Sequence, residues 1–195
     1  MPDVRGEVLL PIARAAIARV LNVPHTADES APWLSGHGAC FVTLTQSGEL
    51  RGCIGTLQAH RSLLEDVKHN AVSAALRDPR FTPLSSEELD VTEIEISLLS
   101  TTLAMDVRDE ADALAQLRPN VDGVIFEYGR YRSTFLPQVW ENLAQPREFL
   151  AMLRRKAGLP DDFWADDVKL SRYSVTKWSE SKKHLAGHLK ERQRG

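Results

Sequence analysis

Segments typical of strands and of helices follow one another in this chain without the strand–helix–strand alternation that parallel sheets require. Residues 39–57 and 124–136 each predict a β-hairpin, because β-favouring residues flank a short turn in both. Apolar residues recur at helical spacing around 8–21, 63–76, 109–117 and 147–157. Single alternating strands are expected at Val91–Leu99 and Val168–Trp178. Because hairpins join antiparallel strands, this order predicts an α+β fold, a mostly antiparallel sheet with flanking helices.

Length and composition fit a compact globular chain. With 195 residues, 43% of them hydrophobic, the chain suits one compact domain, or one domain with a small satellite, and can bury its own core. The balanced composition excludes collagen-like, disordered and coiled-coil classes. The net charge of −3 argues against a chain that binds nucleic acid over its whole surface.

The two cysteines, Cys40 and Cys53, are too few for a disulfide scaffold or a four-cysteine zinc site. No pattern for a metal or a cofactor is found, so none is expected. The apolar stretch Val8–Val20 is interrupted by Arg14 and Arg19, which argues against a signal peptide or a membrane span. We therefore expect a cytoplasmic protein with reduced thiols that does not engage a membrane.

The hairpin turn at Ser47-Gly48 sets an expected register in which Gln46 pairs with Glu49. Continued without interruption, this register places Cys53 opposite Val42 and Cys40 opposite Gly55. The two thiols would then lie diagonally on one face, with Cβ atoms about 7–8 Å apart. A disulfide needs about 3.5–4.5 Å, so no bridge is expected.

The segment Leu50–Thr56 is the most informative for chemistry. Gly52 and Gly55 are costly inside a strand unless a backbone or a ligand must approach closely. Arg51 and Cys53 are two residues apart and are expected on one strand face, where a guanidinium would favour the reactive thiolate. Arg51 could equally hold an anion. On spacing alone, a small buried cysteine is the favoured alternative.

Two later segments add candidate side chains. Asp78 and Arg80 follow a helix end, where a local ion pair is the favoured interpretation and a substrate contact the alternative. Glu95 and Ser97 share one face of a strand, so Glu95 is a candidate general base and Ser97 a polar positioner if that face lines a cleft. A solvent-facing strand side explains the same pattern.

The residues from 179 to 195 carry a net charge of +3, which leaves −6 on residues 1–178. Such a basic tail could bind RNA weakly, since phosphate contacts dominate nucleic-acid affinity. A solvated terminal helix is the favoured interpretation.

Five segments together resemble the AMMECR domain family, also called AmmeMemoRadiSam system protein A, over roughly Leu9–Trp178. They are Leu50–Thr56, Asp78–Phe81, Glu95–Leu99, Leu136–Val139 and Lys156–Pro160. Through the fourth of these, Gln138 joins the candidate substrate-binding residues, which are Arg51, Gly52, Gly55, Asp78, Arg80 and Ser97.

The resemblance implies that residues 1–178 form one AMMECR-like domain, with a larger α+β part and a smaller subdomain that form a cleft. Leu50–Thr56 would lie near that cleft. Three functions follow as hypotheses: an enzyme or enzyme component with Cys53 and Glu95 as catalytic residues, a non-catalytic interaction or scaffold module, and a weak RNA-binding protein. The family name implies Memo-like and radical SAM proteins as partners in a pathway, whose substrate is a small molecule or a nucleic acid.

Overall fold

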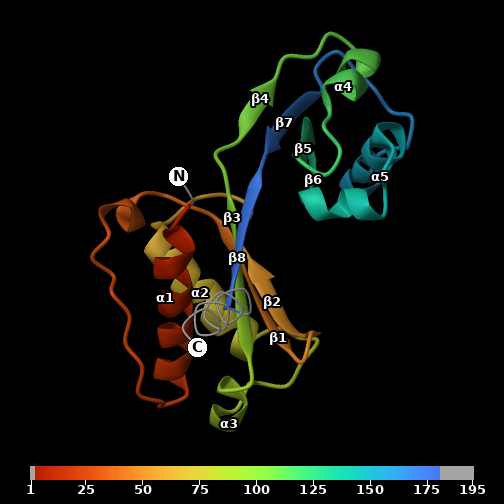
Figure 1. Ribbon diagram of the computed structural model, residues 1–195. Coiled ribbons are helices and arrows are strands. Elements are labelled where there is room, and N and C mark those ends of the chain that lie inside the picture. Colours follow the sequence, from red (N-terminus) through yellow and green to blue (C-terminus); the bar gives the residue numbers. More distant parts are fainter. Residues whose placement is uncertain (1–2, 181–195) are drawn as a thin grey trace, which may run out of the picture. The chain divides into compact units, whose positions relative to one another are not determined.

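The computed structural model of the protein describes residues 3–180 (Figure 1). The chain divides into two compact units. Among the described residues, the first unit contains 3–99 and 176–180, and the second is Ser100–Val175. Each unit has its own four-stranded sheet and its own hydrophobic core.

The first unit carries the Leu50–Thr56 segment. Its elements are α1 (Arg5–Val20), η1 (Pro32–Ser35), β1 (Cys40–Gln46), β2 (Glu49–Gly55), α2 (Leu63–Leu76), α3 (Ser86–Leu89), β3 (Glu93–Leu99) and β8 (Val175–Ser179). The sheet order is β2-β1-β3-β8, so β2 forms an edge, and β1 pairs antiparallel with both β2 and β3. Helices α1 and α2 lie against each other and pack on one face of this sheet (Figure 1).

The core of the first unit follows from the alternation of its strands. Cys40, Val42 and Leu44 of β1, with Ile94 and Ile96 of β3, are fully buried. They meet the apolar stripes of α1 and α2. The opposite face of the sheet carries the polar residues of the same strands, as a two-residue period requires.

The second unit contains β4 (Leu103–Met105), α4 (Glu110–Gln116), β5 (Gly123–Tyr128), β6 (Tyr131–Phe135), η2 (Pro137–Glu141), α5 (Pro146–Ala157) and β7 (Lys169–Tyr173). Its sheet has the order β4-β7-β5-β6, with antiparallel pairs throughout. The core is centred on Trp140 and Phe149, whose rings stack with centroids 3.8 Å apart.

The predicted α+β fold with antiparallel pairing is confirmed. Capping boxes begin α2 and α3, at Ser62–Glu65 and Ser85–Glu88. Val168–Trp178, expected as one strand, is instead two strands: β7 and β8 belong to different sheets and are separated at the exposed Ser174. The apolar positions change phase at this point, from Val168 and Leu170 to Tyr173 and Val175, so one uninterrupted alternating strand was the wrong interpretation. The sequence also did not indicate the short β4.

Two expectations stay untested by the fold. The cleft between a larger and a smaller part remains a prediction, and residues 181–195, most of the basic tail, lie outside the described residues.

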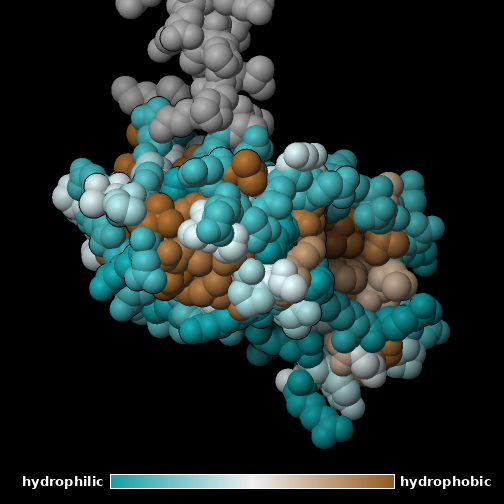
Figure 2. Space-filling view, turned by 90° about the horizontal axis from the view of Figure 1, so that it is seen from below, coloured by the Kyte–Doolittle hydropathy of each residue, from teal (hydrophilic) through white to brown (hydrophobic). Residues whose placement is uncertain are grey.

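Among the described helices, none has the length and apolarity needed to cross a membrane. On the face drawn in Figure 2, hydrophobic residues gather in patches bordered by hydrophilic ones.

Candidate functional site

A bulge in the hairpin determines how the Leu50–Thr56 segment presents its side chains. The pairs Gln46–Glu49 and Thr45–Leu50 follow the expected register, but the next pair is Leu44–Gly52. Arg51 is therefore an extra residue on β2, and every later pair is shifted by one. Cys53 lies opposite Thr43 instead of Val42, and Gly55 opposite Phe41 instead of Cys40.

The bulge places the two cysteines on opposite faces of the sheet, so the expected arrangement on one face is wrong. Cys40 lies in the core and is fully buried, and this burial raises the pKa of its thiol. Cys53 is half-buried on the other face, with its Sγ 3.3 Å from the Oγ1 of Thr43. Both thiols are free, as expected, although the reason is the opposite faces and not the diagonal spacing.

The two glycines of the segment allow close packing inside the protein. A Cβ on Gly52 would lie 2.2 Å from the carbonyl oxygen of Ala74, so only glycine lets α2 approach the strand here. A Cβ on Gly55 would lie 2.2 Å from the ring of Phe41. Packing within the protein therefore accounts for both glycines, and the close approach of a ligand is not needed to explain them.

Arg51 is held inside the first unit by α3 and the segment before it. Its Nε and Nη2 donate to the Glu88 carboxylate at 3.0 and 3.1 Å, and its Nη1 donates to the carbonyl oxygen of Thr82 at 2.9 Å. Only 12% of the side chain is exposed. Hydrogen bonding from Arg51 lowers the pKa of Glu88 to about 2. Arg51 thus acts as a tie between the edge strand and α3, with each guanidinium nitrogen engaged.

Asp78 holds the backbone of Cys53. The buried carboxylate accepts the Cys53 N–H at 2.9 Å and the Arg80 N–H at 3.1 Å. The Arg80 guanidinium also donates to it, with the Nη2–Oδ2 distance at 2.7 Å, and these Arg80 hydrogen bonds hold the pKa of Asp78 far below its usual range. The local ion pair expected from the sequence is therefore present, and it connects directly to the cysteine.

Arg80 is the exposed member of this group. Its side chain is 54% exposed and lies over the Phe81 ring, 5.4 Å from the centroid. Its Nη2 also approaches the carbonyl oxygen of Cys53 at 3.4 Å. Since Asp78 raises the pKa of Arg80 further, the guanidinium stays charged beside the cysteine over the whole physiological range.

The face of the sheet away from the two long helices carries a row of polar residues across neighbouring strands. Thr43 lies opposite Cys53 on one side and opposite Glu95 on the other. The Glu95 carboxylate is 3.6 Å from the ammonium of Lys177, in β8. Cys53 and Glu95 are therefore separated by one strand, or about 9–10 Å between backbones. The strand alternation could have indicated Thr43, but only the sheet order brings in Lys177.

The remaining candidates lie apart from this row. Ser97 lies opposite Phe41 one step along the sheet and is buried. Gln138 is exposed and belongs to η2 in the second unit. Within residues 3–180, no three His, Cys, Asp or Glu side chains are grouped as a metal site would require.

A buried polar network, not indicated by the sequence reading, holds the other end of the hairpin. Asp66 is fully buried and accepts the Cys40 N–H at 2.9 Å, the Thr56 hydroxyl at 2.8 Å and the Arg61 Nε at 2.8 Å. Asn70, one turn later on α2, donates to the Cys40 carbonyl oxygen at 3.0 Å. The signal was two polar residues at i, i+4 spacing on the buried face of a helix.

Comparison with known proteins establishes the family. The sequence profile of AMMECR1 matches residues 10–178. The chain belongs to the AMMECR1 family. Archaeal AMMECR1-like relatives include protein MJ0810 of Methanocaldococcus jannaschii, 37% identical over 87% of both chains. A protein of Methanothermobacter thermautotrophicus is 36% identical over 87% of this chain and 91% of its own.

A solved structure shares the AMMECR1 fold. The crystal structure of uncharacterized protein PH0010 from Pyrococcus horikoshii superposes with a TM-score of 0.75 at 32% sequence identity. The match covers 92% of this chain and 93% of that one. The bacterium Thermotoga maritima has a further relative, 37% identical over 77% of this chain and 84% of its own.

Proposed function

We propose that the protein is an enzyme or enzyme component that uses Cys53 as its reaction centre. The substrate lies on the polar row of the first unit, which is formed by Cys53, Thr43, Glu95 and Lys177. One observation carries this proposal. In the Leu50–Thr56 segment, Arg51, Gly52 and Gly55 have packing roles, whereas the half-buried thiol of Cys53 faces Thr43 on the side of the sheet away from the core.

The exposed charge beside Cys53 suits an anionic substrate. Arg80 lies next to the cysteine, with its guanidinium 3.4 Å from the Cys53 carbonyl oxygen and its side chain 54% exposed. In the proposed step the thiolate forms a carbon–sulfur bond with an electrophilic carbon of the substrate, and the leaving group departs with the electron pair of the bond that breaks. Arg80, and not the fully engaged Arg51, holds the anionic group of the substrate.

Glu95 takes a different role from that of a base for the thiol. Strand β1, with Thr43, lies between Glu95 and Cys53. The Glu95 carboxylate is therefore outside hydrogen-bond reach of the thiol. A substrate spanning the row would meet the thiol at β2 and the Glu95–Lys177 pair at β3 and β8. Glu95 then accepts a proton from the substrate.

Thiol reactivity tests the proposal without a known substrate. Native protein is alkylated with iodoacetamide at pH 7 and followed by intact mass. Cys53 is expected to react at least about ten-fold faster than glutathione, and Cys53→Ser removes this reaction. Arg80→Met slows it several-fold, because the thiolate loses the neighbouring charge. Arg77→Met is the matched control. Arg77 is an exposed arginine just past the end of α2, and its replacement is expected to leave the alkylation rate unchanged.

Two results would reject a reactive thiol. One is alkylation of Cys53 at the glutathione rate, and the other is an equal rate in Arg80→Met and Arg77→Met. Cys40→Ser is a further check, since the buried Cys40 is expected to react only after unfolding.

A second candidate, a non-catalytic binding module, is favoured by the ion pairs. The ion pairs Arg51–Glu88 and Asp78–Arg80 give these charged side chains structural roles inside the first unit. In this case the exposed surface around Arg80 binds a protein partner. We propose Memo-like and radical SAM proteins as candidate partners. Cys53→Ala would then retain a purified partner in a pull-down, whereas Arg80→Glu would lose it. Loss with Cys53→Ala and retention with Arg80→Glu would contradict this alternative.

A further inference from the structure

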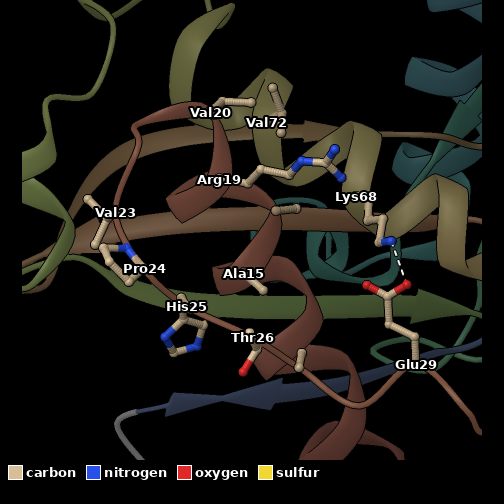
Figure 3. Close-up of a pocket in the computed structure, with 12 residues that line it drawn as sticks. Ala15, Arg19, Val20, Val23, Pro24, His25, Thr26, Glu29, Lys68 and Val72 are labelled. Atoms are coloured by element: carbon tan, nitrogen blue, oxygen red, sulfur yellow. Dashed lines mark hydrogen bonds and ion pairs between the residues drawn. The ribbon is translucent and has the colours of Figure 1, made fainter.

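A pocket of about 730 Å³ opens in the first unit, between α1, the loop that follows it and α2 (Figure 3). Its size falls within the range of pockets that hold small organic ligands. It shares no lining residue with the polar row around Cys53.

The wall of the pocket is mainly apolar. Helix α1 contributes Ala15, Ala16 and Val20, the loop contributes Val23 and Pro24, and α2 contributes Val72. Val20 remains 43% exposed, although an apolar side chain in this position gains from being covered. The lining therefore suits the apolar body of a ligand.

The charges of the pocket are unequal. Lys68 on α2 is neutralised by Glu29 of the loop, with Nζ and Oε2 2.6 Å apart (Figure 3). Arg19 extends its guanidinium across the pocket toward α2 in the same view. Within the described residues, no hydrogen bond or ion pair engages the Arg19 side chain. One positive charge is thus left over beside an apolar wall.

The loop is held in place before any ligand arrives. The Val23 N–H donates to the Ala18 carbonyl oxygen at 2.8 Å, just beyond the end of α1. Val23 and Ala27 pack against the core of the unit. At the far end, the Glu29–Lys68 ion pair ties the loop to α2. A preformed pocket loses less conformational entropy when it binds.

We propose that this pocket binds a small amphipathic anion, a molecule with an apolar body and a single carboxylate or phosphate. The apolar body lies against the alanine and valine wall, and the anionic group pairs with Arg19. The site stands on residues independent of Cys53, so it does not depend on the function proposed above.

Three probes with the same apolar body separate charge from hydrophobic contact. They are 1-naphthaleneacetate, its neutral amide 1-naphthaleneacetamide, and the cation 1-naphthylmethylammonium. We expect one saturable site for the acid by isothermal titration calorimetry, with affinity about ten-fold above that of the amide and the cation weakest. In ¹⁵N-resolved NMR spectra, the shifts should centre on residues 15–29 and 68–72.

Variants locate the site. Arg19→Met keeps the length of the side chain and should reduce the preference for acid over amide to less than two-fold. Arg77→Met removes the same charge from an exposed position of the same unit outside the pocket, and should keep the preference. Ala15→Phe fills the pocket and should weaken all three probes at least ten-fold. If Ala15→Phe does not fold, Arg19→Met still decides.

Equal affinity for acid and amide would overturn the proposal, and so would an unchanged preference in Arg19→Met. Shifts that centre on residues outside the pocket would place the binding elsewhere and have the same consequence. None of these results affects the alkylation of Cys53, so failure here is distinguishable from failure of the thiol proposal.

Discussion

Asp78 determines the backbone position of Cys53. β2 is an edge strand, and an edge presents N–H groups that lack a partner strand. The Asp78 carboxylate accepts one of them, from Cys53, while Arg80 balances its charge. Because the Asp78 side chain is only 2% exposed, water cannot readily replace its carboxylate.

Asp78→Asn is expected to lower the free energy of unfolding by about 1–3 kcal/mol at pH 7, since a buried, charge-assisted set of hydrogen bonds is weakened. The pKa of Asp78 is lower in the folded protein than its ordinary value near 3.9. Its ionised form therefore stabilises the fold above about pH 4, and that stabilisation is lost as the pH falls further. Urea unfolding of both proteins at pH 7 and pH 3 should show the difference shrinking at pH 3.

Asp161→Asn provides the control, because Asp161 pairs with Arg155 at an exposed site where ion pairs contribute little. A loss for Asp78→Asn no greater than for this control, or a difference that grows at low pH, would contradict the role assigned to Asp78.

Contacts along its whole length join helix α2 to the β1–β2 hairpin. Near the start of the helix, Asp66 accepts the Cys40 N–H, and just past its end Asp78 accepts the Cys53 N–H. Between them, the backbone of Gly52 lies against the carbonyl oxygen of Ala74. The shape of the motif is thus imposed by the helix on which the hairpin packs.

Gly52→Ala is expected to destabilise the protein by at least about 2 kcal/mol, because its methyl group would meet backbone that cannot move aside as a side chain would. Gly36→Ala is the matched control: its Cβ would lie 3.5 Å from the Trp33 carbonyl oxygen, an ordinary contact. Thermal unfolding followed by circular dichroism compares the two. Similar melting temperatures for both variants would show that α2 can shift away from the strand.

Local features of the elements were predictable, and their pairing was predictable only in part. The capping box at Ser62 and the helix end at Gly158 depend on residues within a few positions of each other. The hairpin register was correct only as far as Leu50. Beyond it, the bulge at Arg51 depends on Glu88 and Ala74, which are distant in sequence, so the assignment of Cys53 to the face of Cys40 was wrong.

The second unit is inserted between β3 and β8 of the first. Its two ends are close together: the Ser100 N–H donates to the Ser174 carbonyl oxygen, and the Ser174 N–H donates to the Ser100 hydroxyl, both at 2.9 Å. Each unit has a separate core. Neighbouring ends and separate cores are the conditions under which an inserted unit can be removed.

Replacing residues 101–173 by a short Gly-Ser linker should therefore leave the first unit folded. Titration with a disulfide reagent is expected to show one reactive thiol, Cys53, in the native state and a second, Cys40, only in urea. A cooperative thermal transition by circular dichroism should accompany this pattern. Rapid reaction of both thiols without denaturant would show that the first unit needs the second in order to fold.

The sequence by itself determined the α+β class, most helices, both hairpins, and the family resemblance. These features depend on periodicity and turn chemistry over short distances, and such information is local. Only the tertiary structure decided that Arg51 ties the edge strand to α3, that Lys177 meets Glu95, and that Val168–Trp178 passes from one sheet to the other. It also formed the pocket beside Arg19 from two helices and a loop. Each of these requires residues far apart in the chain to meet, and side-chain packing, not local propensity, selects such contacts.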